Sequence, residues 1–203
     1  MKVTEDNRGT TLAEMIVTFA LIGIFLVAAS GVISSAVILH SDLSAAMHAQ
    51  SVGEILIDKV TGELAAAQPK GSRSVVIGES QKAGGTIGEG IAFYDRESNK
   101  SRMYVRDGRL VLSYEETVKI NEYGEVLVSP EREWKLDDKA YMGYQISDLQ
   151  FEKLNDEGVL EVTIRIKNIK TGFEYTVSRA TQCYNFETKA DYAKIAEGNI
   201  LSF

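Results

Sequence analysis

A run of 25 residues without a charged side chain, residues 15–39, most constrains how this chain can fold. The 203-residue chain carries 22 Lys and Arg and 29 Asp and Glu, so a gap of this length stands out against its charged fraction of 25%. As a helix the run would extend about 37 Å, enough to cross a bilayer with some tilt. The sequence therefore predicts one membrane-length segment and a polar-faced domain. It excludes a purely cytosolic enzyme, a multi-span transporter and a disordered chain.

The charges that flank this segment predict its orientation. Lys2 and Arg8 precede it, and no Lys or Arg follows until Lys59. Positive charge concentrates on the cytoplasmic side of membrane segments. We therefore expect a single-pass membrane protein with a cytoplasmic N-terminus and an extracytoplasmic C-terminal domain.

The helical pattern continues beyond the membrane-length segment and becomes amphipathic. Pro69 and Gly71 then end it, so one helix is expected from about Leu12 to Gln68, about 85 Å long. This exceeds any core helix of a single domain, so its N-terminal half must pack on lipid or on other chains. The apolar positions of the amphipathic part recur with helical spacing at Val52, Ile55, Leu56, Val60, Leu64 and Ala67.

Beyond Pro69 the apolar period changes to two, which is typical of strands. Asp107-Gly108 is the strongest hairpin turn, and the apolar stripe of the amphipathic helix is the natural cover for one sheet face. The expected class is α+β, with a long N-terminal helix packed on a mainly antiparallel β-sheet domain. The expected divisions are a leader (1–9), a membrane or filament-core helix (10–39), an amphipathic helix (40–68) and a β-sheet domain (69–203). Strands are expected at 74–77, 91–94, 102–106, 109–114, 125–129, 144–154, 159–167 and 173–181.

The start of the apolar segment carries the most informative motif, Arg8-Gly9-Thr10-Thr11-Leu12-Ala13-Glu14-Met15-Ile16-Val17. A short charged leader ends in glycine, and a carboxylate lies five residues beyond that glycine. This resembles the class III signal of type IV pilins and type II secretion pseudopilins, and the sharp resemblance covers residues 8–35. It implies that a prepilin peptidase cuts between Gly9 and Thr10 and methylates Thr10. The chain departs from the pattern by having Thr10 where Phe is usual, no proline in the helix and no cysteine pair in the distal domain.

The resemblance also implies roles for residues inside the apolar helix. Glu14 would meet the N-terminal amine of a neighbouring subunit during filament assembly, because an unpaired carboxylate is costly in hydrocarbon. Gly23 and Gly31 match places where pilins carry helix-weakening residues, although small residues are also common in any membrane helix. For Glu14, the alternative is an interfacial carboxylate in an ordinary signal anchor.

The expected function is that of a minor pilin or pseudopilin, a structural subunit that helps initiate or cap a type IV pilus-like filament. The large domain favours a minor over a major subunit. The expected partners are other pilin subunits, the prepilin peptidase and the membrane. No enzymatic activity, small-molecule substrate, cofactor or metal is expected. The alternative is a secreted or membrane-anchored binding protein with a conventional signal, cleaved near Ala28-Ala29-Ser30.

The remaining features favour ordinary structural explanations. With a net charge of −7, the chain has no general attraction for nucleic acid. Arg165, Lys167 and Arg179 are the candidate DNA contacts, but a solvated strand face explains them better. Cys183 is expected to be a buried thiol, with an intermolecular disulfide as the alternative. The glycine cluster 84–90 lacks the context of a phosphate loop, and the acidic pairs at 115–116, 137–138 and 156–157 lack calcium-loop spacing.

Overall fold

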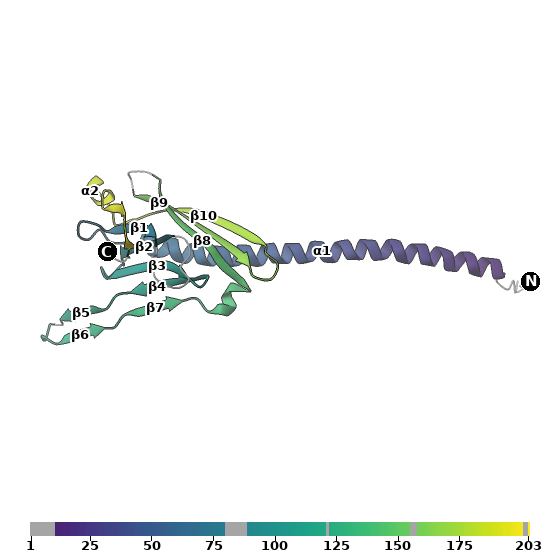
Figure 1. Ribbon diagram of the computed structural model, residues 1–203, viewed down its shortest axis with the longest axis horizontal. Coiled ribbons are helices and arrows are strands. Elements are labelled where there is room, and N and C mark those ends of the chain that lie inside the picture. Colours follow the sequence, from purple (N-terminus) through teal and green to yellow (C-terminus); the bar gives the residue numbers. More distant parts are fainter. Residues whose placement is uncertain (1–10, 80–88, 121, 155–157, 201–202) are drawn as a thin grey trace, which may run out of the picture. The chain divides into compact units, whose positions relative to one another are not determined.

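The computed structural model describes residues 11–79, 89–120, 122–154, 158–200 and 203 (Figure 1). It contains one long helix, α1 (Leu12–Ala65), followed by a β-rich domain. The chain divides into two compact units, Met1–Ala45 and Ala46–Phe203. In the second unit the C-terminal part of α1 packs on mainly antiparallel sheets. The α+β class expected from the sequence is thereby confirmed.

The larger sheet has six strands in the order β11-β1-β2-β3-β4-β7. All its neighbouring strands are antiparallel except β1 and β11, which pair in parallel with Val75 opposite Ile195. The β3–β4 turn is Asp107-Gly108, and both residues have the positive φ that a type I′ turn requires. The strands are β1 (Val75–Glu79), β2 (Glu89–Tyr94), β3 (Lys100–Arg106), β4 (Arg109–Tyr114), β7 (Arg132–Lys135) and β11 (Ile195–Glu197).

The second sheet has three strands in the order β10-β9-β8, all antiparallel. They are β8 (Tyr144–Lys153), β9 (Val159–Asn168) and β10 (Glu174–Gln182), and β8 carries an irregularity between Ile146 and Asp148. A two-stranded ribbon, β5 (Thr117–Ile120) and β6 (Val126–Ser129), continues from β4 and leads into β7. The short helices are η1 (Asp138–Tyr141) and α2 (Lys189–Tyr192).

One hydrophobic core joins the C-terminal part of α1 to both sheets. Leu56 and Val60 of α1 share this core with Phe93 of the larger sheet and Ile164 of the smaller one. Burial of each such side chain contributes about 1.5–3 kcal/mol, so the packing of α1 against both sheets stabilises the unit. The buried residues of α1 are Ala49, Val52, Gly53, Leu56, Ile57, Val60, Thr61 and Leu64.

The expected elements agree with the structure where the hydrophobic pattern is strong. The expected helix end at Gln68 is slightly late, because α1 ends at Ala65. The three strands of the second sheet match to within a residue or so at their ends. Three strands were not expected. β5 and β7 are short and largely exposed, so no buried–exposed alternation marks them, and β11 exists only through its pairing with distant β1.

Gly78 is required by the close approach of β1 to the segment that follows β11. The Gly198 amide donates to the Ile77 carbonyl oxygen at 2.8 Å. A Cβ atom placed on Gly78 would lie 1.7 Å from the Gly198 carbonyl oxygen, and this backbone atom cannot move without breaking the strand pairing.

Replacement Gly78→Ala should therefore lower the free energy of unfolding of the second unit by about 2 kcal/mol or more. Gly62→Ala is the matched control, because a Cβ atom there meets no heavy atom within 4 Å. Since Ala stabilises a helix interior relative to Gly, that control should gain up to about 1 kcal/mol. Urea unfolding of the detergent-solubilised full chain, followed by Trp134 fluorescence, measures both. Equal stability of Gly78→Ala and the unaltered chain would contradict the close approach.

Candidate assembly site at the start of the long helix

The start of α1 is fixed by a reciprocal pair of hydrogen bonds between Thr11 and Glu14. The Thr11 amide donates to Glu14 Oε2 at 2.8 Å, and the Glu14 amide donates to Thr11 Oγ1 at 3.3 Å. The Thr11 hydroxyl also donates to Glu14 Oε2 at 3.2 Å. This is a capping box, which satisfies backbone donors that a helix start otherwise leaves open. The Thr-x-x-Glu pattern at 11–14 could have revealed it from the sequence.

Glu14 therefore has a structural role within its own chain. Its carboxylate accepts hydrogen bonds and compensates the positive end of the helix dipole. A partner amine that approached Glu14 would meet a carboxylate already bound to Thr11. The cleavage residues Gly9 and Thr10 lie outside the described residues.

Gly23 and Gly31 both lie within α1, which runs through them as a continuous helix. No heavy atom outside the neighbouring helical backbone lies within 4 Å of a Cβ atom built at either glycine. Near Gly31 two hydroxyls bond back to the helix: Ser34 Oγ donates to the Ser30 carbonyl and Ser35 Oγ donates to the Gly31 carbonyl. Such bonds compete with the helical ladder and often bend helices. The two hydroxyl bonds thus give a second local reason why the helix could be weak near Gly31. The weakening of the helix at Gly31 itself stays a prediction.

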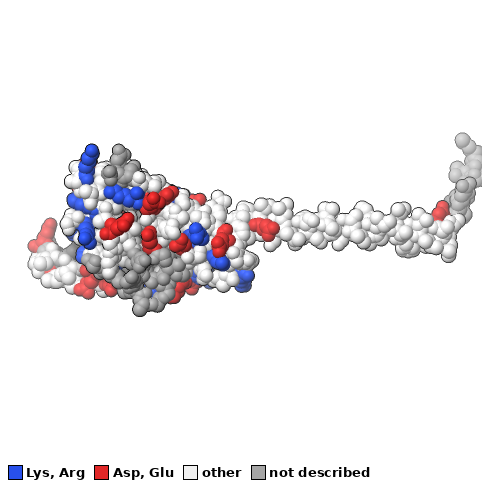
Figure 2. Space-filling view, turned by 45° about the horizontal axis from the view of Figure 1, so that its top comes forward, with Lys and Arg blue, Asp and Glu red and all other residues white. Residues whose placement is uncertain are grey.

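The first part of α1 is apolar around its whole circumference. Its large hydrophobic side chains from Leu12 to Leu39 are between 47% and 79% exposed. Figure 2 shows no charged residue along this stretch except the acidic one at its start. Among the described residues, α1 is the one helix long and apolar enough to span a membrane. A continuous exposed apolar surface of this kind is typical of a segment that contacts lipid or other protein.

The three basic residues considered as DNA contacts each lie beside a carboxylate. The Arg179 guanidinium bridges Glu54, at 2.5 Å, and Asp58 of α1. Lys167 Nζ lies 2.9 Å from Glu174 Oε1, and Arg165 lies 4.0 Å from Asp148. Arg179 therefore joins β10 to the helix. The pairing of all three favours the interpretation of a solvated strand face.

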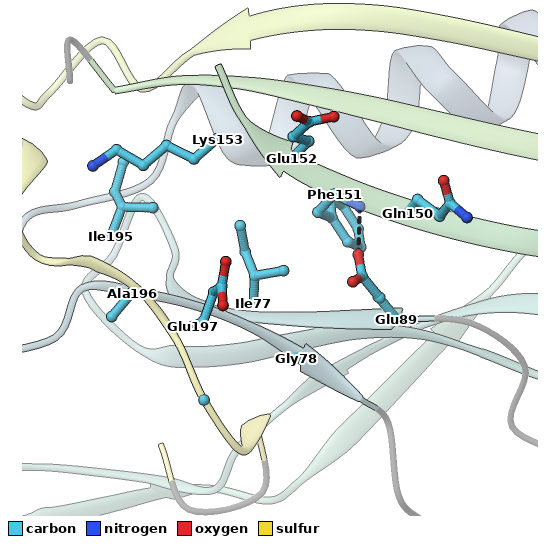
Figure 3. Close-up of a pocket in the computed structure, with 11 residues that line it drawn as sticks. Ile77, Gly78, Glu89, Gln150, Phe151, Glu152, Lys153, Ile195, Ala196 and Glu197 are labelled. Carbon is cyan, nitrogen blue, oxygen red and sulfur yellow. Dashed lines mark hydrogen bonds between the residues drawn. The ribbon is translucent and has the colours of Figure 1, made fainter. Parts of the chain in front are cut away.

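A cleft of about 880 Å³ lies where the two sheets meet (Figure 3). Glu89, Glu152, Glu197 and Lys153 line it, together with backbone and apolar groups. The Glu89 carboxylate accepts the Phe151 amide at 2.8 Å, so it ties β2 to β8. No group of His, Cys, Asp or Glu among the described residues could hold a metal ion. The Glu89 bond to the Phe151 amide thus places the cleft at the seam between the two sheets.

Two of the acidic pairs also have local structural roles. Asp137 caps η1, Asp138 pairs with Arg109, and Glu115 pairs with Arg102. Residues 156 and 157, and most of the glycine cluster 84–90, lie outside the described residues.

Cys183 is a fully buried free thiol. Burial raises the pKa of this thiol from an ordinary value of 9.0 to about 12. The expected burial of Cys183 is thereby confirmed. Because the thiolate is the reactive form, the raised pKa makes this thiol slow to react.

Iodoacetamide should therefore label Cys183 far more slowly in the native chain than in urea between pH 8 and pH 9. Above pH 9 the unfolded thiol is largely ionised, whereas the native thiol ionises only as the pH approaches about 12. Tyr184→Cys in a Cys183→Ser background is the control, because Tyr184 is exposed. Mass spectrometry of the labelled chains gives both rates. Similar native rates at positions 183 and 184 would contradict the burial.

Comparisons of the chain with protein-family models, with curated proteins and with solved structures find no significant match. The geometry of α1 and the order of the residues that precede it are therefore the basis for the proposed function.

Proposed function

We propose that this protein is a subunit of a type IV pilus-like filament, a minor pilin or pseudopilin that helps initiate or cap the assembly. One observation carries the proposal: a single helix is apolar on every side over its first half and buried in a β-sheet domain over its last part. Such a helix serves a subunit that is stored in a membrane and then packs beside other helices. The role proposed is structural rather than enzymatic.

The residue order before and inside α1 supports the same function. The leader ends at Gly9, and Glu14 is the last charged residue before the apolar run. In the proposed pathway a prepilin peptidase cuts between Gly9 and Thr10 and methylates Thr10. The N-terminus is cytoplasmic at that stage, since Lys2 and Arg8 precede the membrane-length segment. The β-sheet domain is then extracytoplasmic, and on the cell surface after assembly.

The second candidate is a secreted or membrane-anchored binding protein. The same apolar run supports it, because Ala28-Ala29-Ser30 fits a conventional signal cleavage site. The two candidates differ in the mature N-terminus. The filament subunit begins at Thr10 and keeps its apolar helix, whereas the secreted protein loses most of that helix.

Mass spectrometry of the mature chain from its native host should find Thr10 as the first residue, carrying one N-methyl group. The Gly9→Val variant is the matched control and should keep the leader, because a branched residue restricts the backbone that the peptidase must bind. A first residue near Ser30 or Gly31 would refute the filament proposal and support the secreted protein.

Loss of the Glu14 carboxylate should stop filament entry while leaving membrane insertion and leader cleavage intact. The Glu14→Ala variant loses both its charge and the cap to Thr11, whereas Glu14→Gln keeps an oxygen that can accept the Thr11 amide. Thr11→Ala removes the reciprocal cap, at a cost of about 1 kcal/mol, but keeps the carboxylate.

If the charge itself acts in assembly, both Glu14 variants should be depleted about tenfold or more from sheared filaments, as loss of a desolvated ion pair would cause. Thr11→Ala should enter nearly normally. Immunoblots of the sheared and membrane fractions give the ratio. Normal entry of Glu14→Gln would remove the charge-pairing role, and equal loss in Thr11→Ala would assign the effect to helix capping instead.

A further inference from the structure

The β5–β6 ribbon exposes an apolar face that nothing in the described chain covers. Cross-strand partners lie on the same face of a ribbon, and so do alternate residues along a strand. Val118 pairs with Val128 and Ile120 pairs with Val126, so these four β-branched side chains form one surface, which we call the ribbon face. They are between 55% and 72% exposed. Figure 1 shows the ribbon at one end of the Ala46–Phe203 unit.

A two-stranded ribbon of this kind is marginally stable by itself in water. Its opposite face carries Thr117, Leu127 and Ser129, and Leu127 is also exposed. The ribbon thus gains little from burial within its own chain. Four exposed β-branched residues on one side suit a contact with another molecule better than contact with water.

A second exposed apolar surface lies at the other end of the same unit. It consists of Met142, Ile169 and Phe173, which we call the turn surface and which are between 37% and 61% exposed. The Ile169 amide donates to the Gly143 carbonyl at 3.1 Å, and the Asn168 amide donates to the Phe173 carbonyl at 2.8 Å. The first bond holds the β9–β10 turn against the segment after η1, and the second closes the turn itself. The turn surface is therefore preformed.

Strand β4 places the two surfaces at opposite ends. At its start, Arg109 donates to the Tyr144 carbonyl at 2.9 Å, close to Met142, and Gly108 accepts the Ile146 amide. At its end, β4 passes into β5 and the ribbon. The six residues of β4 separate the ends by about 20 Å. One chain therefore cannot fold its own ribbon face onto its own turn surface.

The charges beside the two surfaces are opposite in sign. Glu116 and Glu122 are exposed beside the ribbon face. Lys139 and Lys170 are exposed beside the turn surface, where the neighbouring carboxylates are already engaged, Asp138 with Arg109 and Glu174 with Lys167. Complementary charges of this kind select a relative orientation and speed association.

We propose that the ribbon face of one copy of this chain docks on the turn surface of a second copy. The contact joins two different patches, so it is heterologous and leaves a free ribbon and a free turn surface at the two ends of a pair. It can therefore repeat along a row of copies. It goes beyond the proposed function, because it holds equally for a row of anchored copies that never form a filament. The contact needs two copies that are next to each other. A filament subunit present in few copies can also form it where two of those copies are adjacent.

The size of the two patches indicates when the contact forms. Three or four side chains on each copy bury much less than the roughly 1,600 Å² of a standard interface. Such a contact is weak between freely diffusing molecules. It becomes effective when α1 or a membrane already holds the copies side by side, because the effective concentration is then high.

Disulfide cross-linking of the full chain in membranes tests this contact. The test variant carries Val128→Cys in the ribbon face and Ile169→Cys in the turn surface, in a Cys183→Ser background. Both introduced positions are exposed, so neither change removes core packing. The matched control carries Val128→Cys with Tyr184→Cys, a position outside the turn surface that is at least as exposed as Ile169. The single variants Val128→Cys and Ile169→Cys complete the set.

Mild oxidation should give the test variant a ladder of linked chains, about tenfold more abundant than in the control, as expected for a contact with raised effective concentration. Lys139→Glu with Lys170→Glu should reduce the ladder, and adding Glu116→Lys with Glu122→Lys should restore it. Equal cross-linking in test and control variants would overturn the proposal. So would dimers from Val128→Cys alone, which indicate ribbon-to-ribbon contact, or a cross-link exclusively to a different protein.

Discussion

The rest of the structure depends on the burial of one stretch of α1 against two sheets. Leu56, Val60 and Leu64 lie in a core that includes strands from both sheets. Without the helix each sheet would lose the α1 side chains that cover its inner face. The sheets also meet directly, for example through the Glu89 bond to the Phe151 amide and the bond from the Ile146 amide to the Gly108 carbonyl. The domain is thus organised around the same element that carries the apolar segment.

This shared element limits what each part of the chain can change independently. The stretch of α1 in the core must keep its helical phase, since Gly53 lies against Tyr175 and Arg179 bridges Glu54 and Asp58. Residues 15–39 are free of that constraint and need only remain apolar and helical. A filament subunit needs both properties in one helix, and this pairing is the physical basis of the proposed function.

The sequence was most informative where one physical signal dominated. The charge gap, the apolar spacing of 52–67 and Asp107-Gly108 predicted α1 and the β3–β4 hairpin, because each reflects local chemistry. The ribbon strand β5 and the edge strand β7 were missed, since their exposed residues carry no burial pattern. The pairing of β11 with β1 joins distant segments, and no local residue preference encodes it. At the candidate site the charge of Glu14 identified that residue, whereas the role of Thr11 lies in the Thr-x-x-Glu capping pattern, which carries no charge signal of its own.

For the proposed filament subunit, the capping box at Thr11 and Glu14 affects how long a subunit can wait in the membrane. A carboxylate that already accepts hydrogen bonds from its own chain is not left bare at the bilayer edge. Pairing with an incoming amine is then an exchange of one partner for another, so its net gain is smaller than for an unsatisfied charge. In the proposed pathway, the carboxylate of a waiting subunit therefore already has partners before a neighbour arrives. The cap thus reduces the difference in free energy between the waiting and the paired subunit in that pathway.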